Sequence, residues 1–472
     1  MTGRTTENDR PGTPRGSHET GRGHEPQGPG PANPADLPRN HEPDEDHEAD
    51  EGREVGRARR RKEDARLVTG RTTWTDNIRL PGMLYVAFLR APMAHARITR
   101  VDTSAARSRP GVVAAFHGQD FAGEQGSLPC AWPVTEDVVI PDHRLRVIAP
   151  DVGGGFGSKL QVTAEEVLAL LLTRRLGRPV KWTESRSEGN LTVHHGRDQL
   201  QRIRLAAERD GRLRAVQVEL LADMGAYLML VTPGVPLLGA FMYGGIYKMN
   251  AYDFTCTGVF TTKMPTDACR GAGRPEAAFA IERAMDELAH ELGLDPVEVR
   301  RRNWTTHEDF PYTTVCGLTY DSGNYEAATD QALELFGYDA LRAEQARRRA
   351  ERDPVQLGIG VSTFTEMCGI APSRVLGSLN YGAGGWEHAS VRVLPTGKVE
   401  VVTGTSPHGQ GHETAWSQIA ADALGVPFED VSVLHGDTAV SHKGMDTYGS
   451  RSLVVGGVAV LSACEKLTSS PA

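Results

Sequence analysis

The chain of 472 residues contains only six cysteines, and no two of them have the C-x-x-C spacing. Disulfide frameworks, zinc sites and iron–sulfur clusters are built from cysteines at short, regular spacings. We therefore expect reduced thiols and none of these three kinds of site. The cysteines are spread along the chain, at Cys130, Cys256, Cys269, Cys316, Cys368 and Cys464.

The chain also lacks a net positive charge and long apolar runs. The formal net charge of -9 and the isoelectric point near 6.0 argue against a nucleic-acid-binding surface. No unbroken run of about 18 apolar residues occurs, so we expect no membrane span. The first residues lack the apolar core of a secretory signal, and no apolar segment follows the basic residues at 57–62. A cytoplasmic location is the default expectation.

Residues 1–62 contain no aromatic residue, no isoleucine and no cysteine, and are rich in Pro, Gly, Glu, Arg and His. Such a segment cannot bury enough apolar surface to offset the entropy that it loses on ordering. The composition therefore predicts a disordered arm over residues 1–62. The whole chain, with 39% hydrophobic residues, is long enough for about two to four domains.

Strand and helix signals follow the arm without a regular strand–helix–strand period, which predicts an α+β fold. Thr163 and Glu166 form a capping box, and Gly177 ends that helix. Further helices are predicted over 275–293, after Asp295-Pro296, and over 414–424. Strands are predicted over 83–89 and 145–151, and hairpins over 201–220 and 391–402.

Three glycine-rich segments stand out: a first glycine loop (153–159, GGGFGSK), an arginine loop (268–276, ACRGAGRPE) and a second glycine loop (409–413, GQGHE). An arginine flanked by glycines offers backbone N–H groups and a planar cation to an anionic ligand, as a phosphate-bearing cofactor requires. A P-loop is excluded, because Ser158 precedes Lys159 and Leu160 follows it. A tight strand-to-helix turn with no ligand remains an alternative for the first glycine loop.

Other candidate residues favour structural explanations. His408 and His412 are four residues apart, but Gly409 and Gly411 between them disfavour the helix that a shared metal would need. Cys269 has no base beside it in sequence, so we expect an unreactive thiol. The chain has no G-x-S-x-G nucleophile elbow.

Taken together, the three loops and their flanks resemble the molybdopterin-binding large subunit of the xanthine dehydrogenase, aldehyde oxidase and carbon monoxide dehydrogenase family. The matching segments, in the family's order, include GRTTWTDNIRLPGMLYVAFLRAPMAHARI, DVGGGFGSK, PTDACRGAGRPEAAF, TGTSPHGQGHETAWSQIAADALGVP and GMDTYGSRS. The resemblance implies a partial α/β-hammerhead domain at 63–142 and a truncated molybdopterin-binding domain at 143–472.

The resemblance also implies the residues that contact the cofactor. It places Phe156, Arg270 and Gly449 near the metal end of the pterin. The full set is Gly154, Gly155, Phe156, Gly157, Arg270, Gly271, Ala272, Gly409, Gln410, Gly411, His412, Gly449, Ser450 and Arg451. The implied cofactor is molybdopterin with molybdenum, in its cytosine dinucleotide form. Electrons would pass to an iron–sulfur small subunit and a FAD medium subunit, in a heterotrimer that pairs into a larger dimer.

The arginine loop resembles the hydroxylase branch of the family. In carbon monoxide dehydrogenases this loop carries a cysteine that joins copper to molybdenum, and Gly271 stands at that position here. Cys269 stands where the family usually has tyrosine. The implied function is oxidation of an aldehyde or an N-heterocycle, with water as the oxygen source.

Two departures from the family pattern affect activity. Between Asp142 and His143 the chain skips a segment that supplies a glutamine to the metal site, which should leave apolar surface uncovered. No segment before Ala472 matches the loop that carries the family's general-base glutamate, so we assign no catalytic residue. The alternative function is an inactive remnant, or the product of a disrupted gene, that keeps cofactor- or partner-binding surfaces.

Overall fold

The computed structural model describes residues 52–91, 96–124, 146–370, 373–378, 385–441 and 443–469. The chain divides into two compact units, residues 1–53 and 54–472, and the elements below all lie in the second. They form an α+β fold, which confirms the predicted class. The predicted junction at Asp142 and His143 lies outside the described residues.

The described helices and strands have the following bounds. The helices are α1 (Asp64–Val68), α2 (Ser104–Arg107), α3 (Ala164–Leu176), α4 (Arg186–Thr192), α5 (Gly234–Ala240), α6 (Arg274–Leu292), α7 (Pro296–Arg301), α8 (Tyr325–Phe336), α9 (Tyr338–Glu351), α10 (Ser373–Ser378), α11 (His412–Leu424) and α12 (Val458–Ser469). The strands are β1 (Leu84–Tyr85), β2 (Val180–Lys181), β3 (Gln199–Ala207), β4 (Leu213–Gly225), β5 (Ala251–Phe260), β6 (Tyr312–Thr313), β7 (Thr319–Tyr320), β8 (Ala389–Val393), β9 (Val399–Thr403) and β10 (Val431–Leu434).

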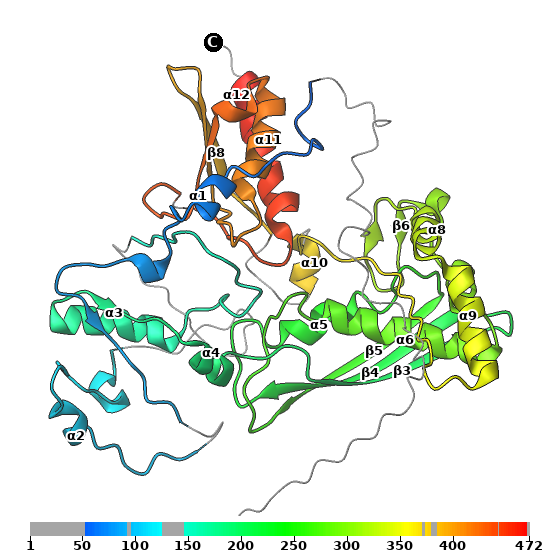
Figure 1. The fold of residues 1–472 in the computed structure, drawn as a ribbon, viewed down its shortest axis with the longest axis horizontal. Helices are drawn as coiled ribbons and strands as arrows, with labels where there is room; N and C mark the ends of the chain where they lie inside the picture. The colour runs from blue at the N-terminus through cyan, green and yellow to red at the C-terminus, as the bar shows by residue number, and fades with distance from the viewer. Residues whose placement is uncertain are drawn as a thin grey trace, which may run out of the picture. The chain divides into compact units, whose positions relative to one another are not determined.

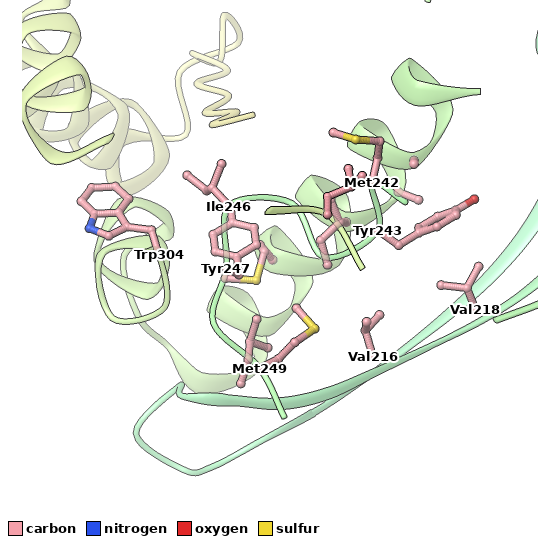
Figure 2. Packing of buried hydrophobic residues seen from close by; sticks show 14 of the residues in the cluster. Val216, Val218, Met242, Tyr243, Ile246, Tyr247, Met249 and Trp304 are labelled. Atoms are coloured by element: carbon pink, nitrogen blue, oxygen red, sulfur yellow. The ribbon is translucent and has the colours of Figure 1, made fainter. Parts of the chain in front are cut away.

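The larger core lies between a three-stranded sheet and helix α6. Strands β3 and β4 form the predicted antiparallel hairpin, and β5 pairs with β4 in parallel. Alternate residues of β4 are buried, because successive side chains of a strand point to opposite faces. Helix α6 runs along this sheet in Figure 1. Figure 2 shows the packed side chains, among them Val216, Val218, Met242, Tyr243, Ile246, Tyr247, Met249 and Trp304.

Helices α3, α6 and α7 have the ends that the sequence predicts. The capping box of Thr163 and Glu166 starts α3, and Gly177 ends it in the left-handed conformation. Gly293, with φ 63°, ends α6 in the same way. Asp295 caps α7 by accepting hydrogen bonds from the amides of Val297 and Glu298. These local signals therefore set the helix boundaries.

The smaller core lies between helices α11 and α12 and a second three-stranded sheet. Strands β8 and β9 form the predicted hairpin, and β10 pairs with β9 in parallel. Helix α12 lies against β8, whereas α11 contacts β10 and β9 (Figure 1). Their buried contacts to the sheet include Trp416 on α11 and Val460 on α12. Helix α11 begins at His412, two residues before the predicted start.

One helical run, Ser452–Ser469, is apolar and long enough to cross a membrane, with a mean hydropathy of 1.3. It contains Ser, Gly, Glu and Lys, so it is not an unbroken apolar stretch. Val460 and Cys464 of this run are buried in the smaller core, but only 22% of the run is buried. A single run of this kind is weak evidence for a membrane span.

Two predicted strands are shorter than expected. The strand over 145–151 is wrong for its described part, where only Ile148 pairs, in a single bridge to Asp437. The reason is that its neighbour is a turn, in which Gly436 has φ 72°. The strand over 83–89 is reduced to β1, which pairs with the two residues of β2. Large apolar side chains nearby are exposed, namely Tyr85, Leu89, Ile98, Val101 and Val113.

Replacing Leu220 with alanine should lower the free energy of unfolding by about 2–5 kcal/mol, because Leu220 is 2% exposed on the core face of β4. Its neighbour Leu221 is 47% exposed, so Leu221→Ala should change the free energy by less than about 0.5 kcal/mol. Urea denaturation of both variants measures the difference. Equal losses would contradict the assignment of the two faces.

Candidate functional site

The first glycine loop and the arginine loop are in direct contact. The amide of Arg270 donates a hydrogen bond to the carbonyl of Phe156 over 2.9 Å. The guanidinium carbon of Arg270 lies 5.6 Å from the centre of the Phe156 ring, within range of a cation–π contact. A Cβ at Gly157 would lie 2.1 Å from the carbonyl oxygen of Ala268, so only glycine permits this approach.

The second glycine loop meets the first one on its other side. A Cβ at Gly155 would lie 3.4 Å from Nδ1 of His408, and a Cβ at Gly409 would lie 3.6 Å from the carbonyl oxygen of Val152. Arg66 of α1 bridges the two loops, since it pairs with Asp151 and with Glu413. The first glycine loop therefore lies between the other two.

A fourth segment, here called the Gly449 loop (residues 444–451), completes the set. Its Asp446 carboxylate accepts a hydrogen bond over 2.9 Å from the amide of Ser406, which precedes the second glycine loop. The carbonyl of Gly449 accepts from the amide of Gly369 over 3.1 Å. A Cβ at Gly449 would lie 2.1 Å from Cδ1 of Ile370, so any other residue there would force the Ile370 side chain to move.

Arg274 connects residues 366–370 to the arginine loop. Its side chain is 4% exposed and donates to the carbonyl oxygens of Gly271, over 2.7 Å, and Met367, over 2.5 Å. Glu366 pairs with the same guanidinium at 3.0 Å. Burial lowers the pKa of Arg274, and Glu366 opposes that shift. Through this arginine, all four loops belong to one connected network.

Backbone strain is concentrated in this network. Among the described residues, eight other than glycine have a positive φ, a conformation that costs energy and clusters at functional sites. Five of them lie in or beside the four loops: Phe156, Ala272, Ile370, Asp446 and Ser450. Two more are Arg197 and Asp198, and Arg197 donates to the carbonyl oxygens of Cys269 and Arg270. The strain marks these loops as the candidate site.

Comparisons with known proteins agree with this location. A family model described as "Molybdopterin cofactor-binding domain" matches residues 124–304, and a second one with that description matches residues 331–470. Residues 69–146 match "Aldehyde oxidase and xanthine dehydrogenase, a/b hammerhead domain". The four loops fall within the two cofactor-binding matches.

Sequence comparison with individual proteins also finds large subunits of this family. The carbon monoxide dehydrogenase large chain of Hydrogenophaga pseudoflava is 40% identical over 70% of this chain and 41% of its own length. The nicotine 6-hydroxylase large subunit of Paenarthrobacter nicotinovorans is 36% identical over 67% of this chain and 38% of its own length. This chain belongs to the molybdopterin-binding large-subunit family.

A solved relative shares the fold. Quinoline 2-oxidoreductase from Pseudomonas putida 86 is 30% identical, with a TM-score of 0.80 over 88% of this chain and 70% of that one. The chain nevertheless spans only about two fifths of the length of the curated relatives named above. The family and its molybdenum cofactor therefore hold for this chain, while the activity of the whole relatives does not transfer with them.

The donor groups of the loops fit a molybdopterin. Within the described residues, the amides of residues 153–157 and 409–412 donate no hydrogen bond to other protein groups. Free amides in glycine-rich loops bind phosphate and other anionic oxygens. Phe156, at 62% exposure, and Gln410 are also open to a ligand. No group of three or more His, Cys, Asp or Glu is placed to hold a metal ion in the described part of the chain.

Two residues that the resemblance implies have buried side chains with protein partners. Arg451 pairs with Glu387 at 2.6 Å, and their side chains are 1% and 0% exposed. His412 is 5% exposed and packs against Trp416, with ring centres 5.2 Å apart. Burial lowers the pKa of His412, which favours its neutral form. In this family member, both side chains are placed to hold their loops in shape.

Replacing Gly157 with alanine should lower the free energy of unfolding by about 1–3 kcal/mol or more, because the added Cβ would overlap the backbone of Ala268 and φ is 99°. Gly153→Ala is the matched control in the same loop. Its Cβ would be 3.6 Å from the Trp74 ring, an ordinary contact, so the change should stay within about 0.5 kcal/mol. Thermal or urea unfolding compares them, and equal stabilities would contradict the observed loop packing.

Proposed function

We propose that the chain is the cofactor-binding large subunit of a molybdenum hydroxylase, and that the four loops hold its molybdopterin. The observation that carries the proposal is the convergence of strained, glycine-rich loops with free amides around the first glycine loop. Such loops hold anionic cofactors without large side chains in the way. The matches to molybdopterin-binding domains give independent support.

In this proposal each loop has a distinct role. Phe156, Arg270 and Gly449 lie at the metal end, and the neighbouring Gly154, Gly155, Gly157, Gly271 and Ala272 let the backbone approach. The second glycine loop and Ser450 hold the pterin and the phosphates of a cytosine dinucleotide form. Gly409, Gly411 and His412 contribute amides. Gln410 offers its side-chain N–H to a heterocycle edge, and its Oε1, which accepts a hydrogen bond from the amide of His408, keeps a second lone pair for the ligand. Arg451 acts through Glu387 on the shape of the Gly449 loop.

The bound cofactor would supply the redox chemistry that inserts oxygen from water into a substrate C–H bond. We infer an aldehyde or an N-heterocycle as the substrate. Two relatives are named as hydroxylating or oxidising nicotine and quinoline, which are N-heterocycles.

The space around Gly271 in this chain also favours an aldehyde or an N-heterocycle over carbon monoxide as the substrate. A Cβ there would lie 2.2 Å from Cγ of Pro275, so the cysteine expected of a copper-containing carbon monoxide dehydrogenase has no room in this loop.

We also propose that the chain works with an iron–sulfur small subunit and a FAD medium subunit in the cytoplasm. The relatives are named as large chains, large subunits or a complex subunit, which supports partner subunits in general.

We assign no general base among the described residues. The alternative of a remnant with binding surfaces alone has no comparison in its favour.

The proposal predicts molybdenum near one atom per chain and aldehyde-dependent dye reduction in the purified protein. Arg270→Ala should lower molybdenum content by about tenfold or more without lowering the unfolding temperature, because residues beside a metal site often change its affinity by that factor. Elemental analysis measures the content, and Arg283→Ala, which removes two surface ion pairs on α6, to Asp286 and Glu287, is the control. Unchanged metal loading in Arg270→Ala, or a wild-type chain without molybdenum, would refute the proposal.

A further inference from the structure

Arg66 forms a four-contact bridge between two loops that are far apart in sequence. Its Nη2 lies 2.9 Å from Oδ1 of Asp151 and 2.6 Å from Oε1 of Glu413. Its Nε donates to Asp151 over 3.1 Å, and its Nη1 donates to Glu413 over 2.9 Å. Asp151 lies two residues before the first glycine loop, and Glu413 is the last residue of the second one. One planar cation therefore ties the ends of both loops.

The Arg66–Glu413 pair stays charged over a wide pH range. Burial tends to raise the pKa of Glu413, but hydrogen bonds from His435 and Arg66 lower it to about 2 overall. The hydrogen bond to Glu413 raises the pKa of Arg66 further above its usual range. His435 lies 3.2 Å from the same carboxylate. Paired, part-buried charges of this kind hold geometry well, because removing one partner leaves the other uncompensated.

The residues just before Arg66 hold the second glycine loop from the same side. Glu63 is 5% exposed and accepts hydrogen bonds from the amide of Glu413, over 2.9 Å, and the hydroxyl of Thr414, over 2.8 Å. It thereby caps α11, whose own N-cap, Gly411, has no side chain. Arg61 donates to the carbonyl of Gly409 over 3.0 Å.

Part of the predicted arm is thus bonded to the site. Arg61 and Lys62 belong to the range 1–62 that composition assigned to disorder, yet both contact α11 or the loop before it. Glu54 also binds Asp422 on α11, through its amide, over 2.6 Å. Charged and polar contacts therefore hold residues 54–62, although their apolar content is low.

We propose that Arg66 is a positioning residue, which fixes the first and second glycine loops in the arrangement that binds the cofactor. This inference rests on the proposed function of those loops. Besides the bridge from Ile148 to Asp437, a link between the ends of the two loops needs a side chain that reaches both. Arg66 supplies that link, while Glu63 fixes the start of α11.

Hydrogen exchange of the cofactor-free chain tests the bridge itself. In Arg66→Ala, the hydrogen-bonded amides of Asp151, Ser158, Ser406 and Glu413 should exchange about tenfold faster or more, because local opening costs less without the bridge. Amides of α6, in the larger core, should keep their wild-type rates. Arg392→Ala removes an exposed ion pair on β8 and should change neither region. Arg66→Lys should give an intermediate rate, because an ammonium cannot pair with both carboxylates through a planar fork.

Two results would overturn the assignment of Arg66: unchanged exchange in both loops, or the same increase in α6 as in the loops, which would indicate general destabilisation. Molybdenum content of the same variants separates this inference from the proposed function. Faster loop exchange with at least a tenfold loss of molybdenum supports both. Faster loop exchange with wild-type molybdenum content would overturn the inference that Arg66 fixes the arrangement that binds the cofactor, while the proposed function stands and is tested separately by Arg270→Ala.

Discussion

The close approach of four loop backbones is the constraint on which the rest of this structure depends. At Gly157 and Gly449 a single added carbon would lie 2.1 Å from an atom of a neighbouring segment. At Gly157 the contact is with backbone, so glycine is required there by packing as well as by its positive φ; at Gly449 the contact is with the Ile370 side chain, which can move. Three of the four loops also hold a residue other than glycine with a positive φ, and the cost of that strain must be offset by the surrounding contacts.

Most of those contacts are ion pairs and hydrogen bonds made by buried or half-buried arginine side chains. Arg274 joins the arginine loop to residues 366–370, and Arg451 with Glu387 holds the Gly449 loop. Arg66 joins the two glycine loops. A buried ion pair adds little net stability, yet it strongly penalises any arrangement in which one partner is left alone. Buried ion pairs therefore favour a single arrangement of the four loops more than they stabilise the fold as a whole.

Local signals in the sequence predict the helices and hairpins well, because caps and turns act over three or four residues. The capping box at Thr163, the cap at Asp295 and the turn after Asp210 all form. Glycine spacing also located three of the four loops without the structure. The bridging charges were not predicted, since Arg66 and Glu413 are 347 residues apart and no local pattern pairs them. The strand over 145–151 failed for a related reason, because its neighbour proved to be a turn.

The most direct test of the account is the position of molybdenum in crystals of the cofactor-loaded chain, found from anomalous scattering at the molybdenum absorption edge. The account predicts one strong peak beside Phe156, Arg270 and Gly449, within the network of the four loops. A peak in any other part of the chain, or a loaded protein whose loops do not touch the cofactor, would contradict it.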